Sequence, residues 1–186
     1  MTKAEIRKRI KAKRDKLKFE QKKKMDQKIC DKLHKSKYWK QARTILIYVS
    51  HKNEVDTNHL ILMYINEKHI IVPKTNPKNH TLTLHKINSL DDLEEKNYGI
   101  LEPKPKTKKI KPDQIDLAII PGIAFDKKGH RIGFGKAYYD RLNKNLKCPK
   151  LGLAYGFQII DNIPAQSHDI PLDLILTEEK TIKITT

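Results

Sequence analysis

Residues 121–140, PGIAFDKKGHRIGFGKAYYD, combine glycines with side chains that could bind a phosphate group. The stretch follows an apolar run, Asp116 to Ile120, whose length and β-branched content are typical of a buried strand. Glycines let backbone N–H groups converge on an anion, and cations and a helix N-terminus add positive charge. The stretch contains the glycines Gly129, Gly133 and Gly135, the cations Arg131 and Lys136, the tyrosines Tyr138 and Tyr139, and the acid Asp140. The segment therefore predicts a phosphate-binding loop.

Two common phosphate motifs do not describe this loop. It is not a Walker A sequence, because Ala137 rather than Ser or Thr follows Lys136. It is not GxGxxG either, because Tyr138 stands where the third glycine belongs. From spacing alone, a glycine-rich connection with solvated cations stays open as an alternative.

The elements around this loop predict an α/β fold. Apolar runs indicate strands at residues 44–49, 70–72, 116–120, 150–154 and 172–176, and alternation indicates another at 81–87. Helical patterns lie before residue 35, after Asp56 or Thr57, and from about 136 to 145, while Pro73 is expected to end a strand and residues 103–112 to form an exposed connection. We expect an open, mostly parallel sheet with helices on both faces, a Rossmann-like three-layer architecture. Ligands of such sheets bind at the carboxyl ends of the strands.

Length and composition favour one domain over residues 1–186. The formal charge of +17 raises the question of nucleic acid, but the lysines are spread along the chain and predict no specific nucleic-acid partner. Apolar runs are too short for a membrane span and no secretory signal is recognisable. Cys30 and Cys148 form no CxxC pair, which favours a reduced, cytoplasmic setting. We expect a monomer or a weak homodimer.

The order of several motifs resembles one enzyme family. PGIAFD..G.RIGFGKAYYDR is similar to the signature of the 5-formyltetrahydrofolate cyclo-ligases, also called 5,10-methenyltetrahydrofolate synthetases. Further matches are K..IR at Lys3 to Arg7, E.DT at Glu54 to Thr57, Y.I.EP at Tyr98 to Pro103, and D.IL at Asp173 to Leu176. Their joint occurrence over nearly the whole chain strengthens the phosphate-loop interpretation.

The resemblance implies an ATP- and Mg²⁺-dependent ring closure. Members of this family convert 5-formyltetrahydrofolate and ATP into 5,10-methenyltetrahydrofolate, ADP and phosphate. An N-formyl group is a stabilised amide whose oxygen is a poor leaving group, so phosphorylation of that oxygen allows N10 to close the ring. The protein must align the γ-phosphoryl group with the formyl oxygen and neutralise the moving charge.

The resemblance also implies roles for individual residues. Lys136 and Arg131 are expected to be catalytic, and Asp140 and Asp173 to bind Mg²⁺. The expected ATP-binding residues are Lys3, Arg7, Arg131, Ile132, Gly133, Phe134, Gly135, Lys136, Ala137, Tyr138 and Tyr139. The expected substrate-binding residues are Val49, Glu54, Tyr98, Phe134, Gly135, Lys136, Ala137 and Tyr138. Ala137 departs from the family, which usually has glycine there; we expect it in the first turn of a helix, where alanine fits well.

Two alternatives belong to other functional classes. One is a basic protein that binds RNA or another polyanion through the same loop without catalysis, with affinity that collapses in salt. The other is a different enzyme on a similar α/β frame, such as a sugar-phosphate isomerase or a CoA transferase, which the fold alone does not distinguish.

Overall fold

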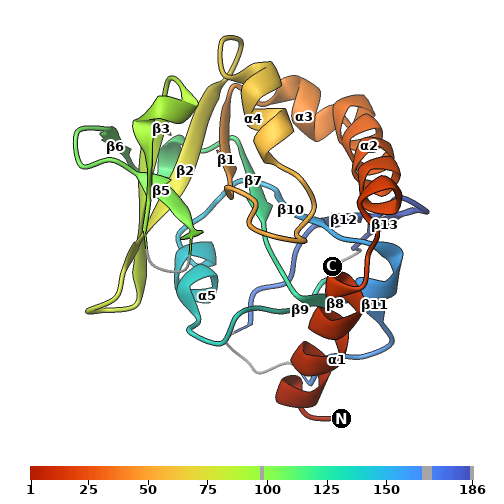
Figure 1. Cartoon of the computed structure of the whole chain (residues 1–186). Coiled ribbons are helices and arrows are strands. Elements are labelled where there is room, and N and C mark those ends of the chain that lie inside the picture. Colours follow the sequence, from red (N-terminus) through yellow and green to blue (C-terminus); the bar gives the residue numbers. More distant parts are fainter. Residues whose placement is uncertain (97–98, 165–168, 185–186) are drawn as a thin grey trace.

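A computed structural model, which describes residues 1–96, 99–164 and 169–184, contains a large central sheet (Figure 1). Its eight strands, in spatial order, are β13 (Thr181–Lys183), β12 (Leu174–Leu176), β10 (Lys150–Leu153), β7 (Leu117–Ile120), β1 (Thr44–Ile47), β2 (His69–Asn76), β3 (Thr81–Ile87) and β6 (Lys108–Ile110). The five strands from β12 to β2 pair in parallel, and β13, β3 and β6 are antiparallel to their neighbours. The predicted open, mostly parallel sheet is confirmed.

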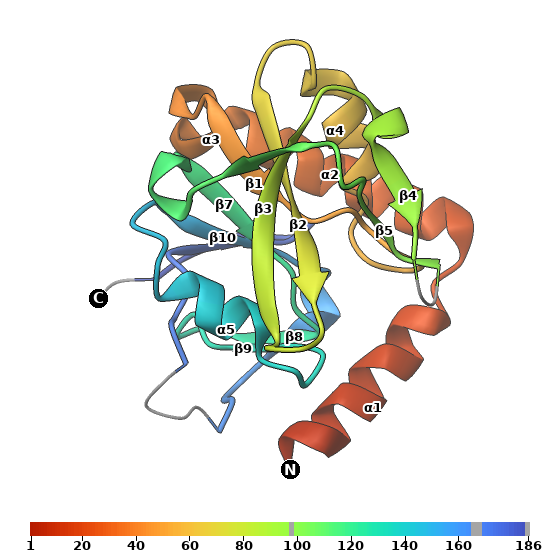
Figure 2. The ribbon, with the colours of Figure 1, turned by 90° about the vertical axis from the view of Figure 1, so that its left-hand side faces the viewer.

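Helices cover both faces of this sheet, as the three-layer prediction requires (Figures 1 and 2). The helices α2 (Phe19–Lys35), α3 (Lys37–Gln41) and α4 (Asn58–Tyr64) lie on one face, and α5 (Tyr138–Asn143) lies on the other. Alternation along β1 joins the layers, because Ile45 and Ile47 pack under α2 to α4 while Leu46 packs on the side of α5. These strand residues are fully buried, which accounts for the continuous apolar run.

The helix α1 (Lys3–Asp15) packs against a smaller sheet beside the main sheet. This smaller sheet consists of β11 (Ile159–Ile160), β8 (Ala124–Asp126) and β9 (Arg131–Ile132). Ile6 and Ile10 of α1 pack against Ile123 and Ile132 in a separate apolar cluster. The remaining described elements are the pair β4 (Leu93–Glu95) and β5 (Leu101–Pro103) and the 3₁₀ turns Leu90–Asp92, Pro112–Gln114 and Gly156–Gln158. The small sheet therefore fixes α1 next to the glycine loop.

Two local expectations are wrong. Pro73 does not end its strand, because β2 continues to Asn76. The parallel pairing of β2 with β1 stops at Ile71, so no hydrogen bond to β1 is lost because Pro73 has no N–H group. Beyond Ile71, β2 continues as a partner of β3 alone. The helix expected over 136–145 is shorter, since α5 begins only at Tyr138. Residues 103–112 also include one edge strand, β6.

Candidate functional site

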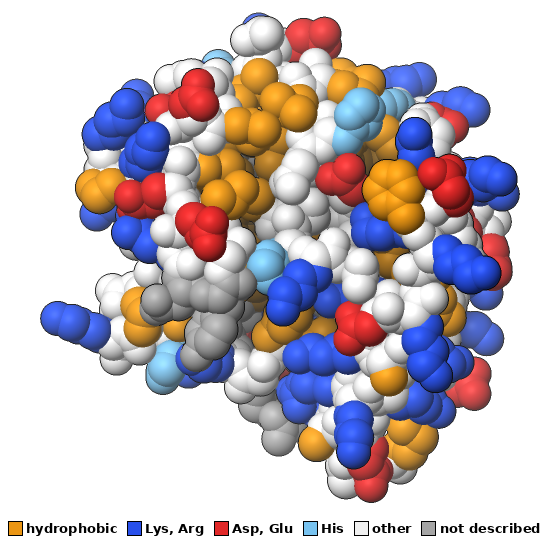
Figure 3. Space-filling view, in the orientation of Figure 1, with side chains coloured by type: hydrophobic (Ala, Val, Ile, Leu, Met, Phe, Trp, Pro, Cys, Tyr) orange, Lys and Arg blue, Asp and Glu red, His pale blue; other side chains and the backbone are white. Residues whose placement is uncertain are grey.

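A cavity of about 660 Å³ lies beside the carboxyl end of β1 and is walled by the glycine loop. Its walls come from α1, from residues 48–54, from β2 and β5, and from residues 131–140. Figure 3 shows this face hollowed at its centre, with Lys and Arg side chains gathered over α1 in the lower part of the view. The predicted site residues among its lining are Val49, Glu54, Arg131, Gly133, Phe134, Lys136, Ala137, Tyr138, Tyr139 and Asp140.

The glycine loop is anchored by the side chain of Arg131. This side chain is buried, and its Nη2 donates a hydrogen bond of 2.6 Å to Oδ1 of Asp140. Its guanidinium also lies 5.7 Å from the centre of the Tyr139 ring, within the range of a cation–π contact. Burial lowers the pKa of Arg131, and Asp140 opposes this shift. Arg131 therefore fixes both ends of the loop, while Phe134, Gly135 and Lys136 between them are exposed.

The backbone of this loop needs positive φ angles at two positions. Gly135 has a φ of 104°, which glycine tolerates. Ala137 has a φ of 54° and a ψ of 25° and stands before the first residue of α5 in the left-handed region. The expectation that Ala137 occupies a helical first turn is wrong, and glycine would suit this position better.

Glu54 and Val49 come from the loop that follows β1. Oε2 of Glu54 accepts a hydrogen bond of 2.9 Å from the backbone N–H of His51. Burial raises the pKa of Glu54, while the His51 N–H and the charges of Arg14 and Lys22 act in the opposite direction. The carboxylate thus lies in the wall of the cavity with most of its hydrogen-bonding capacity available to a ligand.

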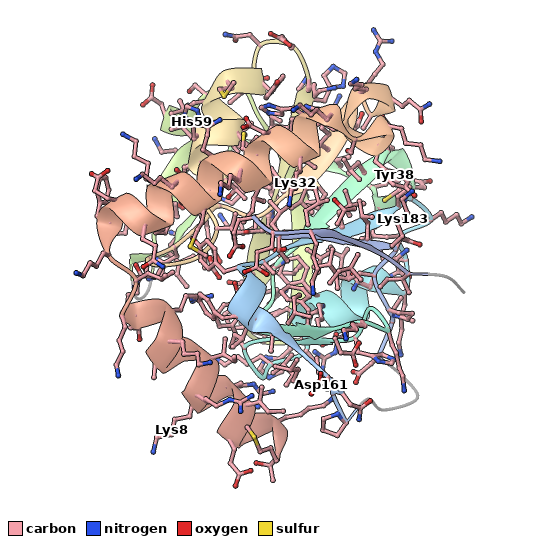
Figure 4. The ribbon with its side chains drawn as sticks, turned by 90° about the vertical axis from the view of Figure 1, so that its right-hand side faces the viewer. Lys8, Lys32, Tyr38, His59, Asp161 and Lys183 are labelled. Atoms are coloured by element: carbon pink, nitrogen blue, oxygen red, sulfur yellow. The ribbon has the colours of Figure 1, made fainter. Side chains whose placement is uncertain are left out.

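The first turns of the basic helix α1 lie behind the glycine loop and are not part of the cavity wall. Arg7 donates from Nε to the carbonyl oxygen of Gly133 at 2.8 Å, and Lys3 pairs with Asp169 at 2.9 Å. Ile132 directs its side chain into the apolar cluster with α1 and is buried. Lys8 extends from α1 away from the body of the molecule (Figure 4). Lys3, Arg7, Ile132 and Gly135 thus do not line the cavity.

The two predicted magnesium ligands are not brought together. Asp140 lines the cavity, but Asp173 precedes β12 at the amino ends of the parallel strands. Oδ2 of Asp173 accepts a hydrogen bond of 2.7 Å from the backbone N–H of Lys150, which begins β10. Within the described ranges, no group of three or more His, Cys, Asp and Glu side chains could hold a metal ion. Asp140 can offer one carboxylate, and the donor set for Mg²⁺ would need phosphate oxygens and water to be complete.

The cavity also contains residues that the sequence analysis did not assign. Arg14 of α1 lines it, and its helical spacing from Arg7 is the one signal that could have indicated this. The lining of the cavity also includes apolar and polar residues from other parts of the chain, Pro73, Thr75, Leu82, Ile100, Leu101 and Glu102. Nothing in the local sequence indicates that these residues line the same cavity as residues 131–140. Tyr98 lies outside the described residues.

A single α/β domain with a small-molecule-sized cleft beside the carboxyl end of a central strand is the architecture of many α/β enzymes. A model of the 5-formyltetrahydrofolate cyclo-ligase family matches residues 1–178, and the chain belongs to this family of enzymes. Among the described residues, no helix has the length and apolar character that crossing a membrane requires.

Relatives of the chain carry the same family name. It is 35% identical over 184 residues to the 5-formyltetrahydrofolate cyclo-ligase of Mycoplasma pneumoniae, covering 96% of this chain and 100% of the relative. It is 33% identical over 144 residues to that of Haemophilus influenzae, covering 74% and 76%. The solved 5,10-methenyltetrahydrofolate synthetase of Aquifex aeolicus superposes with a TM-score of 0.89 at 34% identity, covering 100% of this chain and 94% of that one. A non-catalytic polyanion-binding protein is therefore not favoured.

Proposed function

We propose that the chain converts 5-formyltetrahydrofolate into 5,10-methenyltetrahydrofolate with consumption of ATP and release of ADP and phosphate. The family supports the reaction class. The observation that carries the proposal for this chain is that one cavity is lined by Glu54 and by five residues of the loop, Arg131, Gly133, Phe134, Lys136 and Ala137. A nucleotide phosphate on the loop and a pterin on Glu54 would then meet within this cavity.

The proposed reaction has two steps. The formyl oxygen attacks the γ-phosphorus of ATP, the bond from the γ-phosphorus to the bridging oxygen breaks, and ADP leaves. N10 then attacks the formyl carbon and gives up its proton, the carbon–oxygen bond breaks, and phosphate departs with that proton as the methenyl bridge forms. Both steps require alignment of the reacting groups and neutralisation of charge more than covalent participation by the protein.

Lys136 is the cation best suited to the transferring phosphoryl group. It lies at the exposed tip of the loop and lines the cavity. Arg131 is buried behind it and holds the loop through Asp140, so its charge acts at the base of the phosphate site. The remaining proposed nucleotide contacts are Ile132, Gly133, Phe134, Gly135, Ala137, Tyr138, Tyr139 and Lys3, with Arg7 supporting the loop from α1 through the carbonyl oxygen of Gly133.

Mg²⁺ would complete the phosphate site by neutralising the phosphate oxygens of the nucleotide. Asp140 suits it as a protein ligand because its carboxylate lies beside the loop. Since Mg²⁺ usually keeps several waters and phosphate oxygens as ligands, one carboxylate is a chemically sufficient protein contribution. Asp173 lies at the amino ends of the parallel strands, where it accepts a hydrogen bond from the N–H group of Lys150. From this place it does not join the same ion.

The folate is proposed to enter beside the loop after β1. The carboxylate of Glu54 would accept hydrogen bonds from the N–H groups of the pterin, and Val49 would pack against the ring. Phe134 lines the cavity and is 53% exposed, and Ile100 and Leu101 line it and are exposed as well. These apolar side chains would cover the remaining aromatic part of the substrate.

The direct test is an assay of the Lys136→Ala variant. With 5-formyltetrahydrofolate and MgATP, the increase in methenyl absorbance should slow by about 10²-fold or more, because one charge-stabilising donor is lost. Lys144→Ala is the matched control, since Lys144 is an exposed lysine just after the same helix and should leave the rate unchanged. An undiminished rate in Lys136→Ala would remove Lys136 from its role, and a wild-type protein that forms no methenyl product would refute the proposed function.

A further inference from the structure

Arg14 is a buried cation of the cavity for which the described residues provide no partner. It lies on the last turn of α1, lines the cavity and is 7% exposed. Its Nε has no hydrogen-bond partner, and no described acid forms an ion pair with its guanidinium. By contrast, the buried Arg131 is paired with Asp140. Because an unpartnered buried charge is costly, Arg14 calls for a partner that a ligand would supply.

The place of Arg14 is fixed next to Glu54. Asp15, the following residue of α1, accepts a hydrogen bond of 3.3 Å from the side chain of Asn53, the residue before Glu54. Both Arg14 and Glu54 line the cavity, and the charge of Arg14 lowers the pKa of Glu54 against the effect of burial. The two side chains therefore face the same end of the cavity as a donor and an acceptor that are not joined to each other.

Such a separated donor and acceptor match one edge of a pterin ring. This edge presents N–H donors at the 2-amino group and at N3, and next to N3 it presents the carbonyl oxygen on C4. A carboxylate accepts from the first two groups, and an adjacent guanidinium donates to the third. We propose that Arg14 binds the C4 carbonyl oxygen of the reduced pterin while Glu54 holds its N–H edge. This inference rests on the proposed function, and it makes Arg14 a residue that selects 4-oxo over 4-amino pterins.

A phosphate group is the competing ligand for Arg14, and its position argues against it. The carboxylate of Glu54 would repel a dianionic phosphate at this end of the cavity, whereas it does not repel a neutral carbonyl. The exposed loop with Lys136, which lines the same cavity, is the place proposed for phosphate. A buried donor that loses its acceptor is penalised, so a site of this kind rejects a ring that presents an amino group there.

The experiment measures equilibrium binding by calorimetry in the absence of ATP. The ligands are 5-formyltetrahydrofolate and its 4-amino-4-deoxy analogue, and the proteins are the wild type, Arg14→Gln and Arg9→Gln. Arg9 is an exposed cation on the same helix and serves as the matched control. We expect Arg14→Gln to raise the Kd of the 4-oxo ligand by about 10- to 100-fold, the range for a hydrogen bond to a charged group, with a much smaller effect on the 4-amino ligand.

The ratio of the two Kd values isolates the contact of Arg14. The 4-amino analogue also lacks the N3–H group, so part of the wild-type preference comes from Glu54 and should persist in the variant. The coupling to Arg14 is the change in the ratio between wild type and variant. An unchanged ratio in folded Arg14→Gln overturns the inference. In a separate titration with MgATP alone, a loss of affinity as large as that for the 4-oxo ligand also overturns it, because it would assign Arg14 to phosphate.

Two further measurements keep the test decisive. If circular dichroism shows that Arg14→Gln does not fold, Arg14→Lys replaces it, because lysine retains the aliphatic stem and the charge. Arg14→Lys should still bring the Kd values of the 4-oxo and 4-amino ligands closer together, because the planar pair of donors is lost. With the wild type alone, equal affinity for the two ligands also overturns the inference. A wild-type protein that binds neither ligand would instead refute the proposed function.

Discussion

At the scale of single residues, the environment of Glu54 gives the site a pH dependence. Burial raises its pKa above the ordinary value of 4.5. The ionised carboxylate is the form that accepts hydrogen bonds from a pterin, so affinity for the folate should be full above the raised pKa and decline as the pH falls through it. Folding favours the protonated form, and the contribution of Glu54 to stability therefore decreases as the pH rises through the same range.

Calorimetric titration of the wild type and of Glu54→Gln with 5-formyltetrahydrofolate at several pH values checks this prediction. The wild-type Kd should rise on acidification, and the variant should bind more weakly with a flatter pH profile because it has no carboxylate to protonate. Parallel profiles for the two proteins would show that another group controls binding.

Ala137 carries a cost that a single substitution should relieve. An L-residue in the left-handed region costs about 1–2 kcal/mol, and glycine does not bear this cost. Ala137→Gly should therefore raise the free energy of unfolding by roughly 1 kcal/mol, measured by urea denaturation. Ala12→Gly is the matched control, because Ala12 is an exposed residue inside α1 and glycine there should lower stability by about 1 kcal/mol. A loss of stability in Ala137→Gly would mean that the left-handed conformation is not populated in solution.

At the scale of elements, the two ends of the parallel strands have different tasks. The cavity lies beside the carboxyl end of β1, whereas carboxylates at the amino ends bind backbone N–H groups. Oδ2 of Asp116 accepts hydrogen bonds from the N–H groups of Arg43 and Thr44, just as Asp173 accepts from that of Lys150. Asp173 thus repeats at β10 and β12 what Asp116 does at β1 and β7.

Asparagine variants of the two predicted magnesium ligands should separate these tasks. Asp140→Asn should raise the concentration of Mg²⁺ needed for half-maximal activity, because a carboxylate beside the phosphate loop is lost. Asp173→Asn should lower the melting temperature, since a charge-assisted hydrogen bond to the backbone is weakened, and should leave the Mg²⁺ titration unchanged. A shifted Mg²⁺ titration for Asp173→Asn would return Asp173 to the metal site.

At the scale of the whole molecule, the excess positive charge is distributed and only partly belongs to the site. Lys and Arg side chains gather over α1 beside the hollow in Figure 3, but others, such as Lys183, extend from distant surfaces in Figure 4. The net charge of +17 will attract anionic ligands to the cavity in a salt-dependent way. The ligand contacts that we propose, however, involve only the few cations that the fold buries or places at the cavity.

The sequence alone determined the class of fold and singled out the glycine loop that lines the cavity. Buried parallel strands need continuous apolar runs, and a loop that approaches a phosphate needs glycines and cations close together, so both leave local signals at residues 44–47, 117–120 and 131–136. The tertiary structure alone decided that Ala137 adopts a left-handed conformation, that β2 continues through Pro73, and that Asp173 lies away from Asp140. It also brought Arg14 beside Glu54. These facts depend on contacts between residues far apart in the chain, which no local spacing encodes.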